Sequence, residues 1–340
     1  MYPTLTKQRK MSSRFVLKTC FSKNELINLW NQYHFQPSKS LGQNFLVDAK
    51  VAKETVKALE LDSSDIVYEI GPGCGSLTCL LVPKAKKVTV IEKDKQLVDI
   101  LKNLFQKCPN LEIIEGDILK FLSLPHPQGK FIGNPPYYLS SPLLRQLLSI
   151  KPRPETIVLT LQKELGEKII AQPPRANHLS VFVQLTSQVK IIGPVNRQSF
   201  WPVPAVDSLL LEIRPSKLPL SVEATAIIKL AFSTPRKTLL NGLCSRSGSD
   251  RNKIHLRFAV AKLRRDKVRQ KIREGELRHD EIRLRRDEIR LSLLEAGINP
   301  ESRPGVLQLE EWKKLFKLFS KKEAIFKEKK IRYTRIDSTF

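Results

Sequence analysis

The chain has 340 residues, more than one hydrophobic core usually organises, so we expect two domains. Lysine and arginine number 59 against 34 aspartates and glutamates, and the formal net charge of +25 at pH 7 indicates a polyanionic partner. A hydrophobic content of 41% is too high for a disordered chain, and no apolar run approaches the roughly 18 residues of a membrane helix. The composition therefore excludes disordered and integral membrane proteins and predicts a folded, basic protein.

The cysteines predict neither a zinc site nor a disulfide framework, because they contain no C-x-x-C pair and no cluster flanked by histidine. They are Cys20, Cys74, Cys79, Cys108 and Cys244. A reducing compartment fits this pattern best, and we expect a cytoplasmic protein without a metal.

The first 23 residues contain basic, serine and threonine side chains but no aspartate or glutamate. We interpret residues 1–36 as a basic arm that lies on nucleic acid. The alternative is a mitochondrial or plastid transit peptide, and a second methionine at Met11 leaves the start of translation open.

Residues 37–218 alternate between short apolar runs and amphipathic stretches. A helix is predicted over residues 47–61 with Asp48 as its cap, and another from Ser141-Pro142 through Leu148. Strands are predicted at residues 66–70, 88–91, 111–114, 131–132, 157–161, 189–192 and 209–213. Alternation of strand and helix predicts an α/β domain, whose parallel sheet is covered on both faces.

Residues 219–320 lack strand signals and predict a smaller α-helical domain. Its helix-like stretches are residues 224–232, 237–243, 254–296 and 309–319. A charged helical insertion is predicted at about 245–292, where Leu277, Leu284 and Leu291 recur every seven residues on one stripe. We interpret it as a solvated arm, with a dedicated partner-binding role as the alternative. Residues 321–340 form a basic tail.

A glycine-rich turn at residues 71–75 follows the first predicted strand of the sheet. Glycines there let backbone N–H groups approach a bound nucleoside at the carboxyl edge of the sheet. Nicotinamide-dependent dehydrogenases use a similar turn, but their third glycine falls one position later than Gly75.

Two carboxylates follow the next strands in the same order. Glu92 comes 92 − 71 = 21 positions after Gly71, where an acid accepts hydrogen bonds from two ribose hydroxyls. Asp117 follows the third strand, where it can accept from the exocyclic amine of a bound adenine. Their order after the glycine turn favours a nucleoside site over ordinary surface loops.

The fourth strand ends in Asn134-Pro135-Pro136-Tyr137. The Asn134 oxygen and the Pro135 carbonyl can accept the two hydrogens of an adenine amine, and proline rigidity holds them in place. The ring of Tyr137 can stack on the base, which contributes about 1–3 kcal/mol. A sulfonium methyl donor brings its own leaving group, so alignment replaces a strong general base.

These motifs, in this order, resemble the ribosomal RNA adenine dimethyltransferase family, and within it the bacterial small-subunit enzymes. The resemblance spans about residues 37–319. It is carried by residues 39–46 (KSLGQNFL), the glycine turn, Glu92, Asp117, residues 134–137, 162–164, 200–204, 206–208, 231–243 and 297–300, and Arg303.

The resemblance implies a Rossmann-like methyltransferase sheet that binds S-adenosylmethionine. The cofactor-binding residues that it implies are Asn44, Leu46, Gly71, Gly73, Glu92, Asp117, Ile118 and Asn134. Asn134, Pro135, Tyr137 and Phe200 would form the catalytic set, with Tyr137 and Phe200 sandwiching the target adenine.

The implied reaction dimethylates the exocyclic amines of two adjacent adenosines in the 3′-terminal hairpin of small-subunit rRNA, during maturation of that subunit. The implied RNA-binding residues are Lys39, Lys163, Arg236 and Lys237. We expect a monomer that acts on small-subunit rRNA and a precursor of the 30S type, away from membranes. Pro136 stands where the family usually has leucine or isoleucine, so the sequence leaves open whether one or two methyl groups are added to each adenine.

Two other functions are considered. One is methylation of large-subunit rRNA, as in Erm-type enzymes, although the matches in the helical domain favour the small subunit. The other is a ribosome-assembly or transcription factor of the same fold with weak activity. This second alternative is disfavoured because the site residues are intact, namely Glu92, Asp117, Asn134 and Tyr137.

Overall fold

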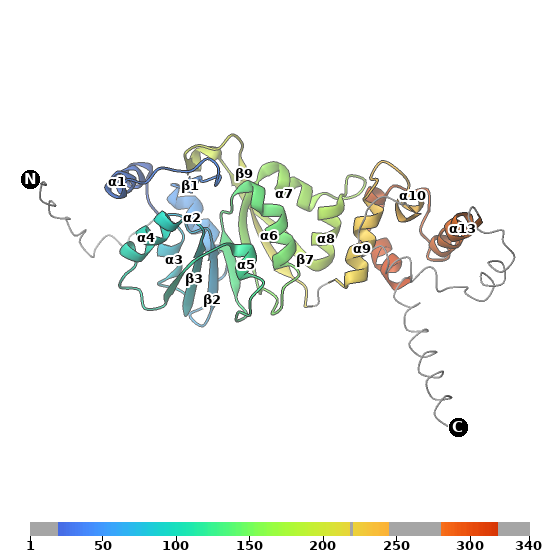
Figure 1. The fold of residues 1–340 in the computed structure, drawn as a ribbon, viewed down its shortest axis with the longest axis horizontal. Coiled ribbons are helices and arrows are strands. Elements are labelled where there is room, and N and C mark those ends of the chain that lie inside the picture. The colour runs from blue at the N-terminus through green and yellow to red at the C-terminus, as the bar shows by residue number, and fades with distance from the viewer. Residues whose placement is uncertain (1–19, 218–219, 245–279, 319–340) are drawn as a thin grey trace, which may run out of the picture. The chain divides into compact units, whose positions relative to one another are not determined.

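A computed structural model describes residues 20–217, 220–244 and 280–318 (Figure 1). Its residues divide into two compact units. The first contains residues up to Glu167 together with Ser187–Lys217, and the second contains Lys168–Thr186 and the residues from Leu218 onward. The second unit therefore begins with a segment, residues 168–186, that the sequence analysis assigned wholly to the α/β domain.

The first unit is built on a seven-stranded sheet in the order β4-β3-β2-β5-β6-β9-β7. The bounds are β2 Ile66–Ile70, β3 Lys87–Glu92, β4 Leu111–Glu115, β5 Lys130–Gly133, β6 Ile157–Gln162, β7 Ser187–Val195 and β9 Ser208–Pro215. Strands β2 to β6 are parallel, whereas β9 pairs antiparallel with both β6 and β7. All seven predicted strands and the Rossmann-like class are confirmed. Strand β9, which runs antiparallel to both of its neighbours, is the departure from an all-parallel sheet.

The helices and short strands that accompany this sheet precede β2 or lie in the connections between the strands. They are α1 Lys23–Tyr33, α2 Ala49–Lys57, α3 Thr78–Leu81, α4 Lys95–Leu104, α5 Ile118–Phe121, η1 Tyr137–Leu139, α6 Ser140–Leu147, α7 Lys163–Ile170, η2 Arg197–Ser199, and the pair β1 Phe45–Leu46 and β8 Phe200–Trp201. Asp48 caps α2 as predicted, accepting from the backbone N–H groups of Lys50 and Val51. The predicted cap of α6 is wrong, because η1 runs directly into that helix and Ser141 already lies within it.

Helix α1 corrects the prediction of a basic arm over residues 1–36. Ser22 and Glu25 form a capping box, and Leu26, Leu29 and Trp30 are buried. The Trp30 ring meets that of Phe45 edge to face, with 5.2 Å between their centroids. Residues 20–36 are thus part of the folded unit, while residues 1–19 lie outside the described part of the chain.

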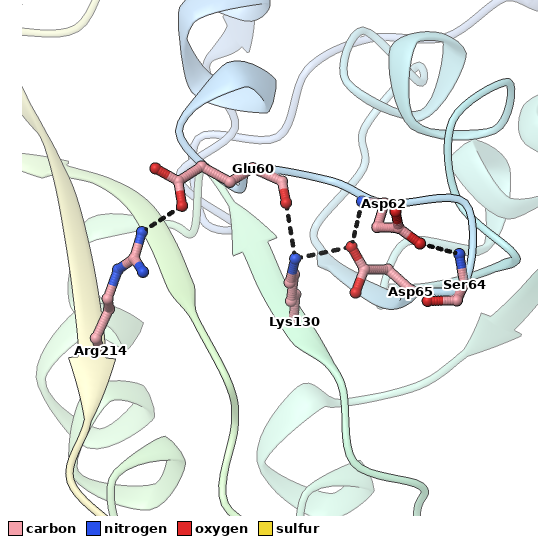
Figure 2. Close-up of polar contacts among 6 residues, drawn as sticks. All are labelled: Glu60, Asp62, Ser64, Asp65, Lys130 and Arg214. Carbon is pink, nitrogen blue, oxygen red and sulfur yellow. Dashed lines mark hydrogen bonds and ion pairs between the residues drawn. The ribbon is translucent and has the colours of Figure 1, made fainter.

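Ion pairs join neighbouring segments at the end of the sheet where the parallel strands begin (Figure 2). Lys130, at the start of β5, lies 2.7 Å from a carboxylate oxygen of Asp65, and both side chains are 12% exposed. Lys130 also donates to the backbone carbonyl of Glu60, whose carboxylate pairs with Arg214 of β9. This network joins β5 and β9 to the loop before β2, on the edge opposite to the ends of the parallel strands.

The second unit is helical, as predicted. Its elements are α8 His178–Thr186, α9 Val222–Ala231, α10 Leu239–Cys244, α13 Asp280–Glu295, η3 Pro304–Val306 and a helix over 309–318. Ile227, Leu293 and Trp312 are fully buried in its core. Among the described residues, no helix is both long and apolar enough to cross a bilayer.

The predicted insertion at 245–292 falls largely outside the described residues, as does the tail at 321–340. Only the end of the predicted insertion, which forms the first part of α13, is described. Leu291, a member of the predicted leucine stripe, is 60% exposed, whereas Leu293 is buried. Leu291 therefore does not belong to the packing face of α13, and Leu277 lies outside the described residues.

Candidate active site

The candidate site lies where the parallel strands end. Strand register places Ile70 beside both Ile91 and Gly133, and Glu92 beside Glu115. The residues that follow these positions therefore meet at one edge of the sheet: the glycine turn after β2, Glu92 at the end of β3, Asp117 after β4 and Asn134 after β5. Ligands of open α/β sheets bind at this edge.

The turn after β2 requires its glycines. Gly71 and Gly73 have φ values of +64° and +59°, in the left-handed region. A Cβ on Gly73 would lie 2.9 Å from the ring of Phe45, so the turn packs directly on that ring. A Cβ on Gly71 would meet no atom within 4 Å, so the space beside Gly71 is available to a ligand.

A cavity opens along this edge, and all eight predicted cofactor-binding residues line it. These are Asn44, Leu46, Gly71, Gly73, Glu92, Asp117, Ile118 and Asn134. Six further polar or aromatic residues line the cavity and were not among the predicted site residues, namely Gln43, Phe45, Glu69, Ser76, Lys93 and Tyr138. Each lies within or no more than two positions from a predicted residue or motif, and that closeness was the only signal in the sequence.

Glu92 is 7% exposed and is held by backbone donors. One oxygen accepts from the N–H of Gly73 at 3.2 Å, and the other accepts from Lys93 and Asp94 at 2.8 and 2.9 Å. Burial raises the pKa of Glu92, although these three N–H groups oppose that rise. A ligand hydroxyl that donates to this carboxylate would further stabilise its ionised form.

Glu69 is a second buried acid in the cavity wall, 1% exposed. The hydroxyl of Thr78 donates to it at 2.6 Å. Burial raises the Glu69 pKa to about 8, with the nearby Glu92 charge acting in the same direction. Glu69 is therefore mostly protonated at neutral pH in the empty cavity, and a cationic ligand would favour its ionisation.

Asp117 lines the cavity and makes two kinds of contact. One of its oxygens caps α5 by accepting from the backbone N–H of Leu119 at 2.9 Å. The other lies 3.4 Å from the ammonium of Lys93, whose side chain is 57% exposed. The second oxygen faces a flexible partner that a bound amine can replace.

Asn134 is oriented by the loop that carries Asn44. Its side-chain nitrogen donates to the backbone carbonyl of Asn44 at 3.1 Å. Because a carbonyl only accepts, the Asn134 atom that faces it must be Nδ2, which leaves Oδ1 as an acceptor for another group. The side chain of Gln43, in the same loop, donates to Asp94, the N-cap residue of α4, at 2.7 Å.

The other three predicted catalytic residues do not line the cavity. Pro135 is buried, and Tyr137 is half-buried with its hydroxyl 3.3 Å from that of Ser208. Phe200 is 2% exposed, because β8 pairs with β1 and carries its ring into the core. The expected sandwich of Tyr137 and Phe200 is therefore not presented to the cavity in this structure.

The four predicted RNA-binding residues are all exposed. Lys39 lies just before the loop with Asn44, and Lys163 begins α7 at the end of β6, so both belong to the first unit. Arg236 and Lys237 lie between α9 and α10 of the second unit. Each unit thus carries predicted RNA-binding lysines or arginines on its surface.

Comparison with known proteins identifies relatives over most of the chain. The sequence model of the family "Ribosomal RNA adenine dimethylase" matches residues 34–274. A protein of Dehalococcoides mccartyi named "Ribosomal RNA small subunit methyltransferase A" is 33% identical over 294 residues, covering 83% of this chain and 88% of that protein. A Clostridium botulinum protein of the same name is 36% identical, covering 63% and 82%.

Solved structures resemble the chain over a similar extent. A dimethyladenosine transferase from Plasmodium falciparum has a TM-score of 0.66 at 28% identity, covering 82% of this chain and 98% of that one. The 23S rRNA methyltransferase ErmE has a TM-score of 0.58 at 25% identity, covering 82% and 100%. Since the family match spans more than half of the sequence and both folds agree, the chain belongs to the ribosomal RNA adenine dimethylase family.

Proposed function

We propose that this protein transfers methyl groups from S-adenosylmethionine to the exocyclic amines of two adjacent adenosines in the 3′-terminal hairpin of small-subunit rRNA. The small-subunit names of its sequence relatives support this choice of RNA. The proposal includes a monomer that acts in the cytoplasm on a precursor of the 30S type, as a step in maturation of that subunit.

The orientation of Asn134 carries the proposal. An adenine amine is a poor nucleophile, because its lone pair is delocalised into the ring. Oδ1 of Asn134, left free by the bond from Nδ2 to Asn44, accepts one amine hydrogen and favours a lone pair directed at the methyl donor. Since β5 ends at Gly133, a rigid strand fixes the position of this acceptor.

The charges in the cavity fit S-adenosylmethionine, which supplies a cationic, methylated sulfur when bound. The chain carries a net charge of +25, yet the acidic and basic residues that line the cavity are three acids and one lysine: Glu69, Glu92, Asp117 and Lys93. We assign Glu92 to the ribose, Asp117 and Ile118 to the adenine, and Asn44, Leu46 and the glycine turn to the remainder. Their common placement at one sheet edge supports this assignment.

Methyl transfer to purified, unmethylated small subunits tests the proposal. Incubation with labelled S-adenosylmethionine should produce dimethyladenosine, which mass spectrometry of the digested RNA identifies and counts. Large subunits serve as the parallel substrate, because the similarity to ErmE makes them the other ribosomal target. Label in the large subunit alone would refute the substrate, and cofactor binding without label in either would favour a binding factor.

A further inference from the structure

The cavity is lined by an exposed aromatic residue, Tyr138, that has no role in the proposed methyl transfer. Tyr138 lines the cavity and is 59% exposed. It lies in η1, four residues after Asn134, whereas Tyr137 and Phe200 contribute nothing to the cavity wall. A tyrosine that lines a cavity while more than half of the residue's surface remains exposed lies at the rim of that cavity.

The position of the Tyr138 ring is set by the facing loop. A Cβ on Gly42 would lie 3.9 Å from both Cδ1 and Cε1 of Tyr138, so one edge of the ring borders the backbone of that loop. The same Cβ would lie 3.3 Å from Cβ of Pro136. The ring is thus supported along one edge, and its exposure leaves area for another planar group.

The ligand that such a ring fits is an unpaired nucleobase. Aromatic side chains stack on single-stranded bases, and stacking is the recurrent mode of recognition when RNA bases are splayed out. The target adenine must pass into the cavity to reach Asn134, so the base left at the rim is its neighbour in the RNA. The net charge of +25 suits a polyanion in this position.

We propose that Tyr138 stacks on the nucleobase next to the adenosine that is being methylated. This inference rests on the proposed function, for which that neighbour is the other adenosine of the pair. Tyr138 would then hold the second adenine outside while Asn134 engages the first, and it would act in RNA binding without contacting the cofactor.

The test uses Tyr138→Ala and Tyr138→Phe, with Leu124→Ala as the matched control, because Leu124 is 63% exposed and does not line the cavity. The probe is an RNA hairpin with one target adenosine and 2-aminopurine beside it, a purine whose fluorescence is quenched by stacking. In the presence of S-adenosylhomocysteine, Tyr138→Ala should lose the quenching and bind the RNA about 5- to 150-fold more weakly. Tyr138→Phe and Leu124→Ala should behave like the wild type.

A second hairpin with an abasic site beside the target separates stacking from a merely structural role. The wild type should bind this RNA as weakly as Tyr138→Ala binds the intact one, and the variant should show no further loss. Unchanged quenching in Tyr138→Ala would overturn the proposal, as would weaker S-adenosylhomocysteine binding with unaltered RNA binding. Quenching is read without methyl transfer, so the stacking result stands whether or not the wild type methylates the hairpin.

Discussion

We expect Glu69 to make the affinity for S-adenosylmethionine depend on pH, because burial raises the pKa of this carboxyl group. Its pKa is raised to about 8, so the empty cavity holds it protonated at neutral pH. If the cationic cofactor requires the carboxylate, removing that proton costs about 1 kcal/mol at pH 7 and almost nothing at pH 9, above the pKa. The affinity of the wild type for S-adenosylmethionine should therefore rise about tenfold over this range.

Glu69→Gln is the matched variant, because glutamine keeps the size of the side chain and still accepts the hydrogen bond from Thr78. Isothermal titration calorimetry at pH 7, 8 and 9 measures both proteins. The amino group of the ligand titrates identically in both experiments, so only the difference between the two pH profiles reports on Glu69. Parallel profiles would refute the reasoning, as would equal proton release measured in buffers of different ionisation enthalpy.

The same pKa predicts an effect on stability. The unfolded chain releases the Glu69 proton near pH 4.5, whereas the folded protein keeps it up to about pH 8. The contribution of this residue to stability is therefore full below pH 4.5 and falls as the pH rises to about 8. The melting temperature of Glu69→Gln should lack this part of the decline, which thermal unfolding across pH 5 to 8 measures.

Three further predictions concern named contacts. Asn134→Ala should lower the rate constant of methyl transfer in single-turnover assays by about 10²- to 10³-fold, while RNA affinity stays within about twofold. A near-normal rate constant would refute the role of Asn134 as acceptor. Gly75→Ala should destabilise the fold by about 1–3 kcal/mol in urea titrations, because Gly75 has a φ of +91° and its Cβ would lie 2.6 Å from the Phe105 ring. Lys130→Met should lower the free energy of unfolding by about 3 kcal/mol, because it leaves the largely buried carboxylate of Asp65 without its ion-pair partner. Lys87→Met should lower it by less than about 1 kcal/mol, because its pair with Glu112 is exposed. Both lysines lie 2.7 Å from their carboxylates, so equal losses would show that burial does not decide the outcome.

The sheet was predictable from the sequence because its central strands are buried on both faces. Runs such as residues 66–70 and 157–161 are almost wholly apolar, and turn residues bound them. Helix α1 was missed, since its apolar residues stand among polar ones next to a basic segment. The Ser22-x-x-Glu25 capping box was the available signal, and it marks the start of that helix.

The common position of the eight predicted lining residues was also predictable, because strand order alone brings the carboxyl ends of β2 to β5 to one edge. Glu69 and Lys93 depend instead on tertiary facts. The burial that raises the pKa of Glu69 and the approach of Lys93 to Asp117 arise only when the strands are assembled. The pattern of residue types in the sequence predicts neither the burial of Glu69 nor the approach of Lys93 to Asp117.

The aromatic half of the site shows how one short strand pair couples two distant motifs. Leu46 of β1 lines the cavity and is paired in register with Phe200 of β8. The loop just before β1 supplies the carbonyl that orients Asn134, and Asp48 just after it accepts from the hydroxyl of Ser199 at 2.9 Å. Residues 44–48 therefore link the cavity wall, the hydrogen bond that orients Asn134 and the segment of Phe200 through backbone geometry. The burial of Phe200 follows from that pairing, since moving its ring to the cavity would require β1 and the Asn44 carbonyl to move with it.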